Sequence, residues 1–534
     1  MRPQLLVAAF VAAVPSASRL TAQPCDSVTS RTSLSAFAGA PIRSVRIVTQ
    51  SPQRLPGVGN ALDKLHVRTR DRTVRRQLLF AAGDTVDTLG VAESIRRLRR
   101  DRYLRDVELR GVRCRGAVDV VVTTRDDWSV KPKLQVRSAG KSELGLTERN
   151  LLGSGRELSL HVRTQQGRVG VGVALNDPWF LGSRVGAVIS QDTYRDGSDL
   201  TGTLRLREET VLAPWGAELS GQETEYEPDG VGLDRFGRGT AHLLVRRRVF
   251  DTRAAVLSVL GGVESESSRL VAAPGAPIVG PSRASRNFVG VTLGVARASV
   301  AYDTLTWMLP NDAIVDVPLS FETEATLGLG RDAVLGAPMM HLDLWAGRAW
   351  IPSGRALAVA DLWASGYASA GRWDAATFRA ALAYYQAAKR GFWSTRVTAE
   401  RLLNPDPDVR TFVTIDPTAS LLPRDNRLAA AALGFTVERD VRLRTLTRSW
   451  ALDGALFAAA SSRWESVEPS PEHLDVATLG FGLRLTPARA GRATARLDVG
   501  LPVAGSSLAR RGVYVGIGLS PWWGDDRHRA GRRD

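Results

Sequence analysis

Alternation of apolar and polar residues dominates the chain beyond Trp128. In residues 157–163 the aliphatic side chains fall on one side, and the Glu, Ser, His and Arg side chains fall on the other. The same period of two recurs in residues 200–207, 492–499 and 513–519. A strand with this period has one apolar face and one polar face. The pattern therefore predicts β-strands through most of the chain.

The length of these segments favours a membrane barrel. Most of them span about 9–13 residues, and a transmembrane strand needs about 9–11 residues. Soluble β-sandwiches and propellers also have alternating strands, but their strands are usually shorter. Because only a closed barrel satisfies the strand backbone in lipid, we predict a transmembrane antiparallel β-barrel over residues 127–534. We expect an even number of strands, about 16, with 18–20 as the alternative.

Aromatic residues are expected to lie near the ends of these strands. Such residues form girdles at the two membrane interfaces of barrels. The candidates are Trp179, Phe180, Trp215, Trp345, Trp350, Trp363, Trp522 and Trp523.

Residues 42–126 have a different pattern, that of a small α/β domain. Residues 42–47 resemble a half-buried strand, and residues 71–80 and 87–100 carry apolar residues at helical spacing. Two further strands are expected over residues 103–109 and 117–123, joined by a turn at residues 111–116. The predicted order is β-α-α-β-β.

The first 23 residues have the composition of a secretory signal peptide. Arg2 is a short positive region, an apolar run follows, and small residues end near Ala22. Residues 24–41 are rich in Ser, Thr and Ala without a period, so we expect a flexible leader there. The chain has two cysteines, Cys25 and Cys114, which either form a disulfide in an oxidising compartment or remain two unpaired thiols.

Composition and motifs argue against other function classes. The 534 residues carry a net charge of +16 and a sequence pI of about 10.6, but the arginines are scattered rather than clustered. We therefore interpret the charge mainly as composition, with attraction to anionic lipid headgroups as a second contribution, and expect no nucleic-acid partner. The histidines lack metal-ligand spacing, and no Gly-x-Ser-x-Gly motif occurs. We expect no metal, no cofactor and no enzymatic activity.

Several segments resemble the outer-membrane protein 85 superfamily, whose members combine POTRA domains with a bacterial surface antigen barrel. The β-α-α-β-β segment resembles one POTRA domain, and the resemblance covers nearly the whole chain beyond the predicted signal peptide. Residues 148–155 resemble the turn after the first barrel strand of that family, with Glu148, Asn150, Gly153 and Gly155 as its characteristic residues. Asp177-Pro178-Trp179-Phe180 resembles the end of its third strand.

Two further motifs of the family fit less well. The last strand, with Gly512, Val515 and Ile517, loosely matches the terminal signal for barrel insertion, but the chain continues into a charged tail. The family also has an Arg-Gly-aromatic motif in a long loop that binds acidic residues of the barrel wall. Arg390, Gly391 and Phe392 have these letters at a tight turn, whereas the long-loop position, residues 404–426, offers only Arg424.

The resemblance implies an outer-membrane protein with its N-terminal domain in the periplasm. Its function would be to assist insertion or translocation of other proteins. The expected partners are outer-membrane lipid, lipopolysaccharide, and unfolded outer-membrane or secreted client proteins. A POTRA domain offers an open sheet edge to which a client strand could add. The alternative function is a passive channel or structural barrel whose POTRA-like domain is a plug, spacer or anchor.

Overall fold

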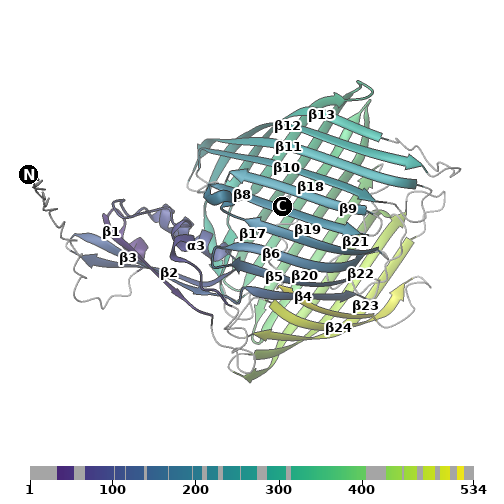
Figure 1. Ribbon diagram of the computed structural model, residues 1–534. Coiled ribbons are helices and arrows are strands. Elements are labelled where there is room, and N and C mark those ends of the chain that lie inside the picture. The colour runs from purple at the N-terminus through teal and green to yellow at the C-terminus, as the bar shows by residue number, and fades with distance from the viewer. Residues whose placement is uncertain are drawn as a thin grey trace, which may run out of the picture.

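A computed structural model shows a small α/β domain attached to one end of a large β-barrel (Figure 1). The structure describes residues 33–521 except 53–65, 102, 115, 138–140, 166–167, 195–196, 207–212, 227–232, 253, 273–284, 308–313, 404–428, 448–449, 466–472, 488–492 and 506–513. The predicted signal peptide, Cys25, Arg424, Gly512, Trp522 and Trp523 lie outside the described residues.

The N-terminal domain has the predicted β-α-α-β-β order. Its elements are β1 (Ile42–Gln50), α2 (Asp71–Arg75), α3 (Thr88–Arg100), β2 (Leu104–Cys114) and β3 (Ala117–Asp126). The sheet order is β1-β3-β2, with β1 parallel to β3 and β2 antiparallel to it. Asp87 caps α3 by accepting hydrogen bonds from the backbone of Leu89 and Gly90. Helix α2 is shorter than predicted, and β2 continues through most of the predicted turn at residues 111–116.

The prediction of a flexible leader over residues 24–41 is wrong for its described part. Residues Leu34–Phe37 form a short 3-10 helix, η1, and Leu34 is fully buried in the core of the N-terminal domain. Phe37 packs over Gly111 of β2, where a Cβ atom would lie 2.5 Å from the Phe37 ring. Two apolar residues in a Ser- and Ala-rich segment have no visible period, so their burial could not be inferred from the pattern.

The barrel is a closed antiparallel sheet of twenty strands among the described residues. This number is even and equals the upper end of the predicted alternative, not the preferred count of 16. The barrel strands are β4 (Val130–Arg137), β5 (Lys141–Leu151), β6 (Arg156–Gln165), β7 (Arg168–Asp177), β8 (Val185–Tyr194), β9 (Gly197–Leu206), β10 (Trp215–Tyr226), β11 (Leu233–Asp251), β12 (Ala255–Ala272), β13 (Ser285–Ser299), β16 (Glu322–Asp332), β17 (Pro338–Ser353), β18 (Ala356–Ser369), β19 (Arg372–Ala388), β20 (Gly391–Leu403), β21 (Ala429–Thr447), β22 (Trp450–Glu465), β23 (His473–Pro487), β24 (Ala493–Gly505) and β25 (Tyr514–Pro521).

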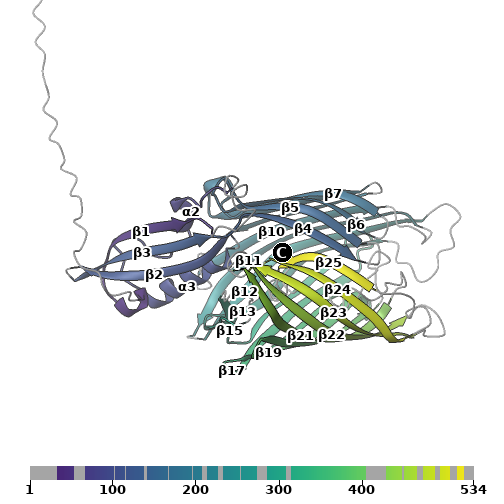
Figure 2. The same ribbon diagram turned by 90° about the horizontal axis from the view of Figure 1, so that it is seen from below.

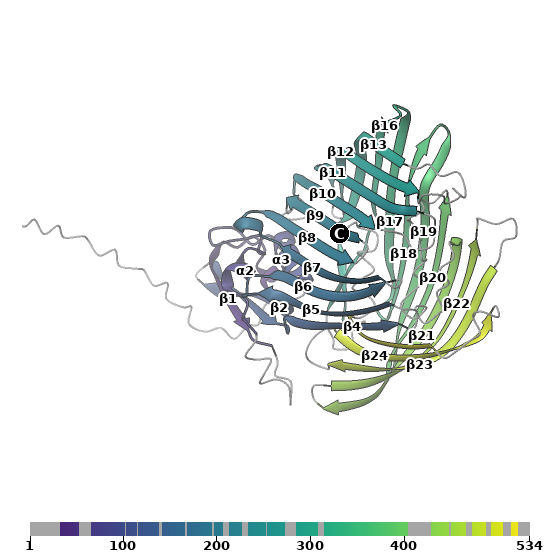
Figure 3. The same ribbon diagram turned by 45° about the vertical axis from the view of Figure 1, so that its right-hand side comes forward.

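Two short elements at the end that carries the N-terminal domain do not belong to the barrel sheet. The 3-10 helix η2 (Phe180–Gly182) forms the turn between β7 and β8. The hairpin of β14 (Tyr302–Leu305) and β15 (Val315–Pro318) connects β13 to β16. Figures 1 and 3 show the N-terminal domain beyond this rim of the barrel.

The outer wall of the barrel is apolar and the inner wall is polar. On β7, for example, Val169, Val171 and Val173 are exposed and alternate with glycine and alanine. Exposed aliphatic residues occur in the same way along most of the barrel strands. An apolar outside around a polar inside is the arrangement with which a barrel spans a membrane. The predicted class, a transmembrane antiparallel barrel after a small α/β domain, is confirmed. No helix in the described part of the chain is long and apolar enough to cross a membrane.

Two of the predicted girdle residues face the lumen instead. Trp345 and Trp363 are cross-strand partners on β17 and β18. They alternate with Leu344 and Leu362, and Leu362 is exposed on the outer wall. Period two alone fixes which residues share a face, but it does not say which face is outside.

The first barrel strand is β4, which the sequence pattern missed. The turn at residues 148–155 was expected after the first barrel strand, but it follows the second strand, β5. Lys131, Pro132 and Lys133 interrupt the apolar alternation of β4. Pro132 also lacks a backbone N–H, a feature that is tolerated at the edge of a sheet but not within its ladder.

The barrel closes between β25 and β4 along a short seam (Figure 2). Residues 516–518 pair with residues 135–137, which is three residue pairs, whereas β4 pairs with β5 over eight. Residues 130–134 of β4 have no strand partner on their seam side among the described residues.

The burial of Leu34 predicts that η1 stabilises the N-terminal domain. We expect Leu34→Ala to destabilise this domain by about 2–5 kcal/mol, because it leaves a cavity in the core. Hydrogen–deuterium exchange of β1–β3 amides in the full chain would then be faster. Leu89→Ala, at an exposed position of α3, is the control and should leave exchange unchanged. Equal exchange in both variants would show that η1 does not support the core.

Candidate functional site at the mouth of the barrel

The N-terminal domain contacts the barrel rim at three places. It holds the β5–β6 turn through residues 66–73 and 126–129, and it meets the β7–β8 turn where Arg76 lies over the Trp179 ring at 5.4 Å. Helix α3 reaches the β14–β15 hairpin. Because seven strands separate β5 from β13 in the barrel order, these contacts place the domain across the opening of the lumen.

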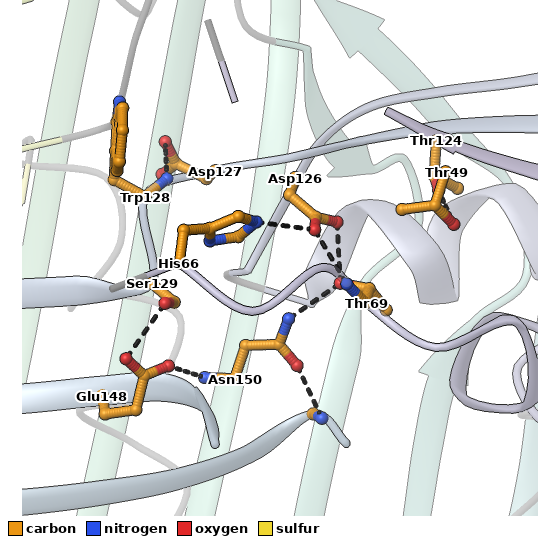
Figure 4. A network of polar contacts seen from close by, with 11 residues as sticks. Thr49, His66, Thr69, Thr124, Asp126, Asp127, Trp128, Ser129, Glu148 and Asn150 are labelled. Carbon is orange, nitrogen blue, oxygen red and sulfur yellow. Dashed lines mark hydrogen bonds and ion pairs between the residues drawn. The ribbon is translucent and has the colours of Figure 1, made fainter. Parts of the chain in front are cut away.

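A buried polar network joins the domain to the β5–β6 turn (Figure 4). Asp126, which is 1% exposed, accepts hydrogen bonds from the backbone N–H of Thr69 at 2.8 Å and from its hydroxyl at 2.7 Å. His66 Nε2 lies 3.0 Å from the same carboxylate. The Asn150 amide donates to Thr69 Oγ1 at 2.8 Å and accepts from the Gly155 N–H at 2.8 Å. Each bond is protected from water, so loss of one partner leaves a buried polar group unsatisfied.

Glu148 extends this network to the start of β4. Its two carboxylate oxygens accept from the Asn150 N–H at 2.7 Å and from the Ser129 hydroxyl at 3.0 Å. Lys131 of β4 lies 3.0 Å from Asp127. We call His66, Thr69, Asp126, Ser129, Glu148 and Asn150 the junction network. It therefore connects the N-terminal domain to the strand that forms one side of the seam.

The two turn glycines allow the close approach of the domain. Gly153 has a φ of 71°, and its carbonyl accepts from the Arg70 N–H and the Thr73 hydroxyl, each at 3.0 Å. A Cβ atom on Gly153 would overlap the Arg68 carbonyl oxygen. Gly155 has a φ of 73°, and its Cβ would lie 2.8 Å from the Tyr103 hydroxyl. The four residues predicted for this turn thus lie together, in contact with the N-terminal domain.

The β14–β15 hairpin links α3 to the inner wall. Arg99 pairs with Asp316 at 3.2 Å, and Arg96 lies over the Tyr302 ring at 4.4 Å. Burial lowers the pKa of Arg96, but Tyr302, Glu93 and Asp316 outweigh this effect and raise it, so the guanidinium stays charged.

The other side of the hairpin packs on the lumen wall. Leu305 and Val317 are buried in one apolar cluster with residues of β17–β20, namely Ala349, Leu357, Ala383, Tyr385 and Phe392. Leu382 and Tyr384 alternate with Ala383 and Tyr385 and are exposed on the outer wall, so the cluster lies inside the barrel. The hairpin therefore lies in the mouth of the lumen, between the N-terminal domain and the wall.

Arg390 lies in the turn between β19 and β20, and Gly391 begins β20, at the rim that carries the N-terminal domain. Both are exposed, and the Arg390 carbonyl accepts from the Arg442 N–H at 3.0 Å. Gly391 has a φ of 123°, and a Cβ atom there would overlap the Asp440 carbonyl. Phe392 belongs to the apolar cluster beneath the hairpin. The long-loop position, residues 404–426, lies outside the described residues.

Charged residues on the inner wall of β21–β24 were not predicted. Arg484 binds both Glu438, at 3.0 Å, and Asp498, and Arg496 binds Asp498 at 2.8 Å. Arg442 pairs with Asp453. Arg496 and Asp498 lie two residues apart on β24, but only the strand register brings Glu438 and Arg484 to them. Sequence spacing could not have found the whole cluster.

Of the remaining predicted residues, the structure describes Cys114, Val515 and Ile517. Cys114, at the end of β2, is disulfide-bonded, and Cys25 is the only other cysteine of the chain. Val515 and Ile517 of β25 are exposed on the outer wall.

The described residues contain no group of three or more His, Cys, Asp or Glu residues that could hold a metal ion.

Comparison with known proteins gives similarity at the level of structure only. No protein-family model and no curated protein matches the chain. Among solved structures, CdiB from Escherichia coli matches with 11% identity and a TM-score of 0.46, covering 90% of this chain and 76% of that one. BamA from Haemophilus ducreyi lacking POTRA domains 1–3 matches with 10% identity and a TM-score of 0.33, covering 90% and 84%. CdiB from Acinetobacter baumannii matches with 12% identity and a TM-score of 0.35, covering 90% and 74%.

The junction network predicts a specific loss when Asn150 is replaced. Asn150→Ala removes a buried donor and a buried acceptor, so we expect docking of the N-terminal domain to weaken by about 1–3 kcal/mol. Limited proteolysis of the folded protein should then cleave faster near residues 66–70. Asn176→Ala, at an exposed position of β7, is the matched control. If both variants are cleaved at the rate of the parent protein, the network does not hold the domain.

Proposed function

We propose that this chain is an outer-membrane protein of the outer-membrane protein 85 type that assists insertion or translocation of other proteins. In this proposal residues 1–23 are a signal peptide, and the N-terminal domain is a single POTRA domain in the periplasm. The clients are unfolded outer-membrane or secreted proteins, and the surrounding partners are outer-membrane lipid and lipopolysaccharide.

The short seam is the observation that carries the proposal. Unpaired backbone groups on residues 130–134 of β4 are a template for another strand. Opening three residue pairs breaks fewer hydrogen bonds than opening any longer ladder of the barrel. A client strand could therefore pair with β4 before the client inserts into the membrane.

The N-terminal domain offers a second strand edge. Strand β1 lies at one side of the three-stranded sheet. Beyond Ile42, which bonds to Gly83 and Asp84, its outer edge has no strand partner in the described part of the domain. An extended client segment can add to such an edge through main-chain hydrogen bonds. The junction network ties this domain to Ser129 and so to β4. A client held on the domain would be bound to a unit that is fixed to the start of β4.

The proposal assigns the loop motif no role at Arg390. Arg390 lies in an exposed turn at the rim that carries the N-terminal domain. Glu438 and Asp498 of the β21–β24 wall already have arginine partners on that wall. Arg424 remains the candidate for a loop arginine, because it belongs to the long-loop position.

A passive channel or structural barrel is the second candidate. It is favoured by the domain and the β14–β15 hairpin, which together lie across the mouth of the lumen as a plug would. In that case the domain would close or anchor the barrel and would bind no client. The two functions differ in whether the seam must open.

Locking the seam tests insertion directly. The backbones of Val136 and Ile517 are partners across the seam, so Val136→Cys with Ile517→Cys should form a crosslink. We expect the oxidised variant to lose the ability to speed the folding of a client barrel into lipid vesicles, and reductant to restore it. The control crosslinks Leu134→Cys to Leu144→Cys between β4 and β5, where no opening is required. Full activity with a locked seam would contradict the proposal.

The plug-like hairpin makes a separate prediction for conductance. Asp316→Arg places two positive charges together at the contact with Arg99, so we expect the hairpin to detach from α3. Planar-bilayer recordings should then show larger or more frequent openings than those of the parent protein. Asp303→Arg, an exposed site on the same hairpin, is the control. Unchanged conductance would mean that the hairpin does not obstruct the lumen.

A further inference from the structure

Arginine–aromatic pairs recur on the outer wall near the rim that carries the N-terminal domain. Arg247 lies over the Trp215 ring at 4.6 Å, on β11 and β10. Arg439 lies over Trp393 at 5.3 Å, on β21 and β20. Arg348 lies over Trp350 at 5.3 Å within β17, and Arg297 lies over Phe321 at 6.0 Å beside β13 and β16. We call Arg247, Arg297, Arg348 and Arg439 the arginine girdle.

Strand register places these pairs on the lipid side. Trp215 is 50% exposed and shares its face of β10 with the exposed Leu219. Trp350 is exposed on the same face of β17 as Met340. Trp393 is exposed and faces Arg439 directly in the ladder. Arg297 continues the outward row of β13, in which Val289, Val291, Leu293 and Val295 are exposed. The girdle therefore lies where the apolar belt of the barrel ends.

Three girdle arginines lack an acidic partner among the described residues. In the described part of the chain, no carboxylate lies within ion-pair distance of Arg247, Arg348 or Arg439. A guanidinium stacked on a ring keeps the donors at its edge free, and these donors match the oxygens of a phosphate. The guanidinium groups of these three arginines are thus held in place by the rings and have no acidic partner among the described residues.

The distribution of these pairs is one-sided. The other arginine–aromatic pairs described within the barrel strands, Arg163 with Tyr194 and Arg286 with Tyr367, face the lumen. At the opposite end of the barrel, the exposed Arg331, Arg372 and Arg401 have no aromatic partner in the described structure. Among the described residues, the stacked arginines of the outer wall therefore face one leaflet of the membrane.

We infer that the arginine girdle is a binding site for the phosphate groups of anionic glycerophospholipids in the leaflet next to the N-terminal domain. The stacked aromatic ring fixes each guanidinium at headgroup depth, while the ring itself lies against the upper acyl chain. Negative headgroups supply the counterions that the protein lacks there. The inference rests on the membrane-spanning barrel and is independent of the proposed insertion activity.

Native mass spectrometry of the full chain in neutral detergent tests this inference. Dioleoyl phosphatidylglycerol should remain bound, whereas dioleoyl phosphatidylcholine and inorganic phosphate should not. A variant with Arg247→Gln, Arg348→Gln and Arg439→Gln should bind phosphatidylglycerol more weakly by about fivefold for each arginine lost. The control carries Arg331→Gln, Arg372→Gln and Arg401→Gln, which removes the same charge from the opposite end. It should bind as the parent does.

Three results would overturn the inference: unchanged binding in the girdle variant, an equal loss in the control, or retention of inorganic phosphate in place of the lipid. The shift of gel mobility on boiling shows whether each variant forms the closed barrel. If the triple variant does not fold, the three single variants are compared in the same way, and unchanged lipid binding in all three contradicts the inference.

Discussion

A backbone amide in lipid has no water to bind, so every strand of a membrane barrel must pair with a neighbour on both sides. Twenty strands satisfy this requirement here by forming a closed sheet, in which the last strand, β25, pairs with the first, β4. The ladder between β25 and β4 is the shortest in the barrel. Pro132 has no backbone N–H, so the β4 edge has one donor fewer. The apolar belt, the polar lumen and the position of the N-terminal domain all depend on this closure.

Around the closure the chain builds a connected set of contacts at one rim. The junction network fixes the N-terminal domain to the β5–β6 turn and to the start of β4. The β14–β15 hairpin continues the connection from α3 to the inner wall of β17–β20. A force on the N-terminal domain would therefore reach both the mouth of the lumen and one side of the seam. This coupling is consistent with the proposed function and with a plug that can be displaced.

Local patterns in the sequence predicted which segments are helices or strands better than they predicted the contacts between these segments. Period two along β6 and helical spacing along α3 are properties of neighbouring residues, so both elements were recognised. Strand β4 was missed because Lys131, Pro132 and Lys133 hide its alternation, and η1 was missed because two apolar residues make no period. The turn at Asn150, Gly153 and Gly155 was marked by resemblance, but its contact with Thr69 depends on a fold that no local pattern encodes. The same holds for Glu438, Arg484 and Asp498, which meet only through the register of the four strands β21–β24.

The central claim is that the seam between β25 and β4 is the weakest part of the barrel. Hydrogen–deuterium exchange of the folded protein in lipid nanodiscs measures this directly, because exchange follows the opening of each ladder. We predict that peptides from β4 and β25 exchange at least about tenfold faster than peptides from β6 and β7, which are paired along their lengths. Equal protection of the four strands would contradict the account, because it would mean that the barrel closes as firmly at its ends as within its wall.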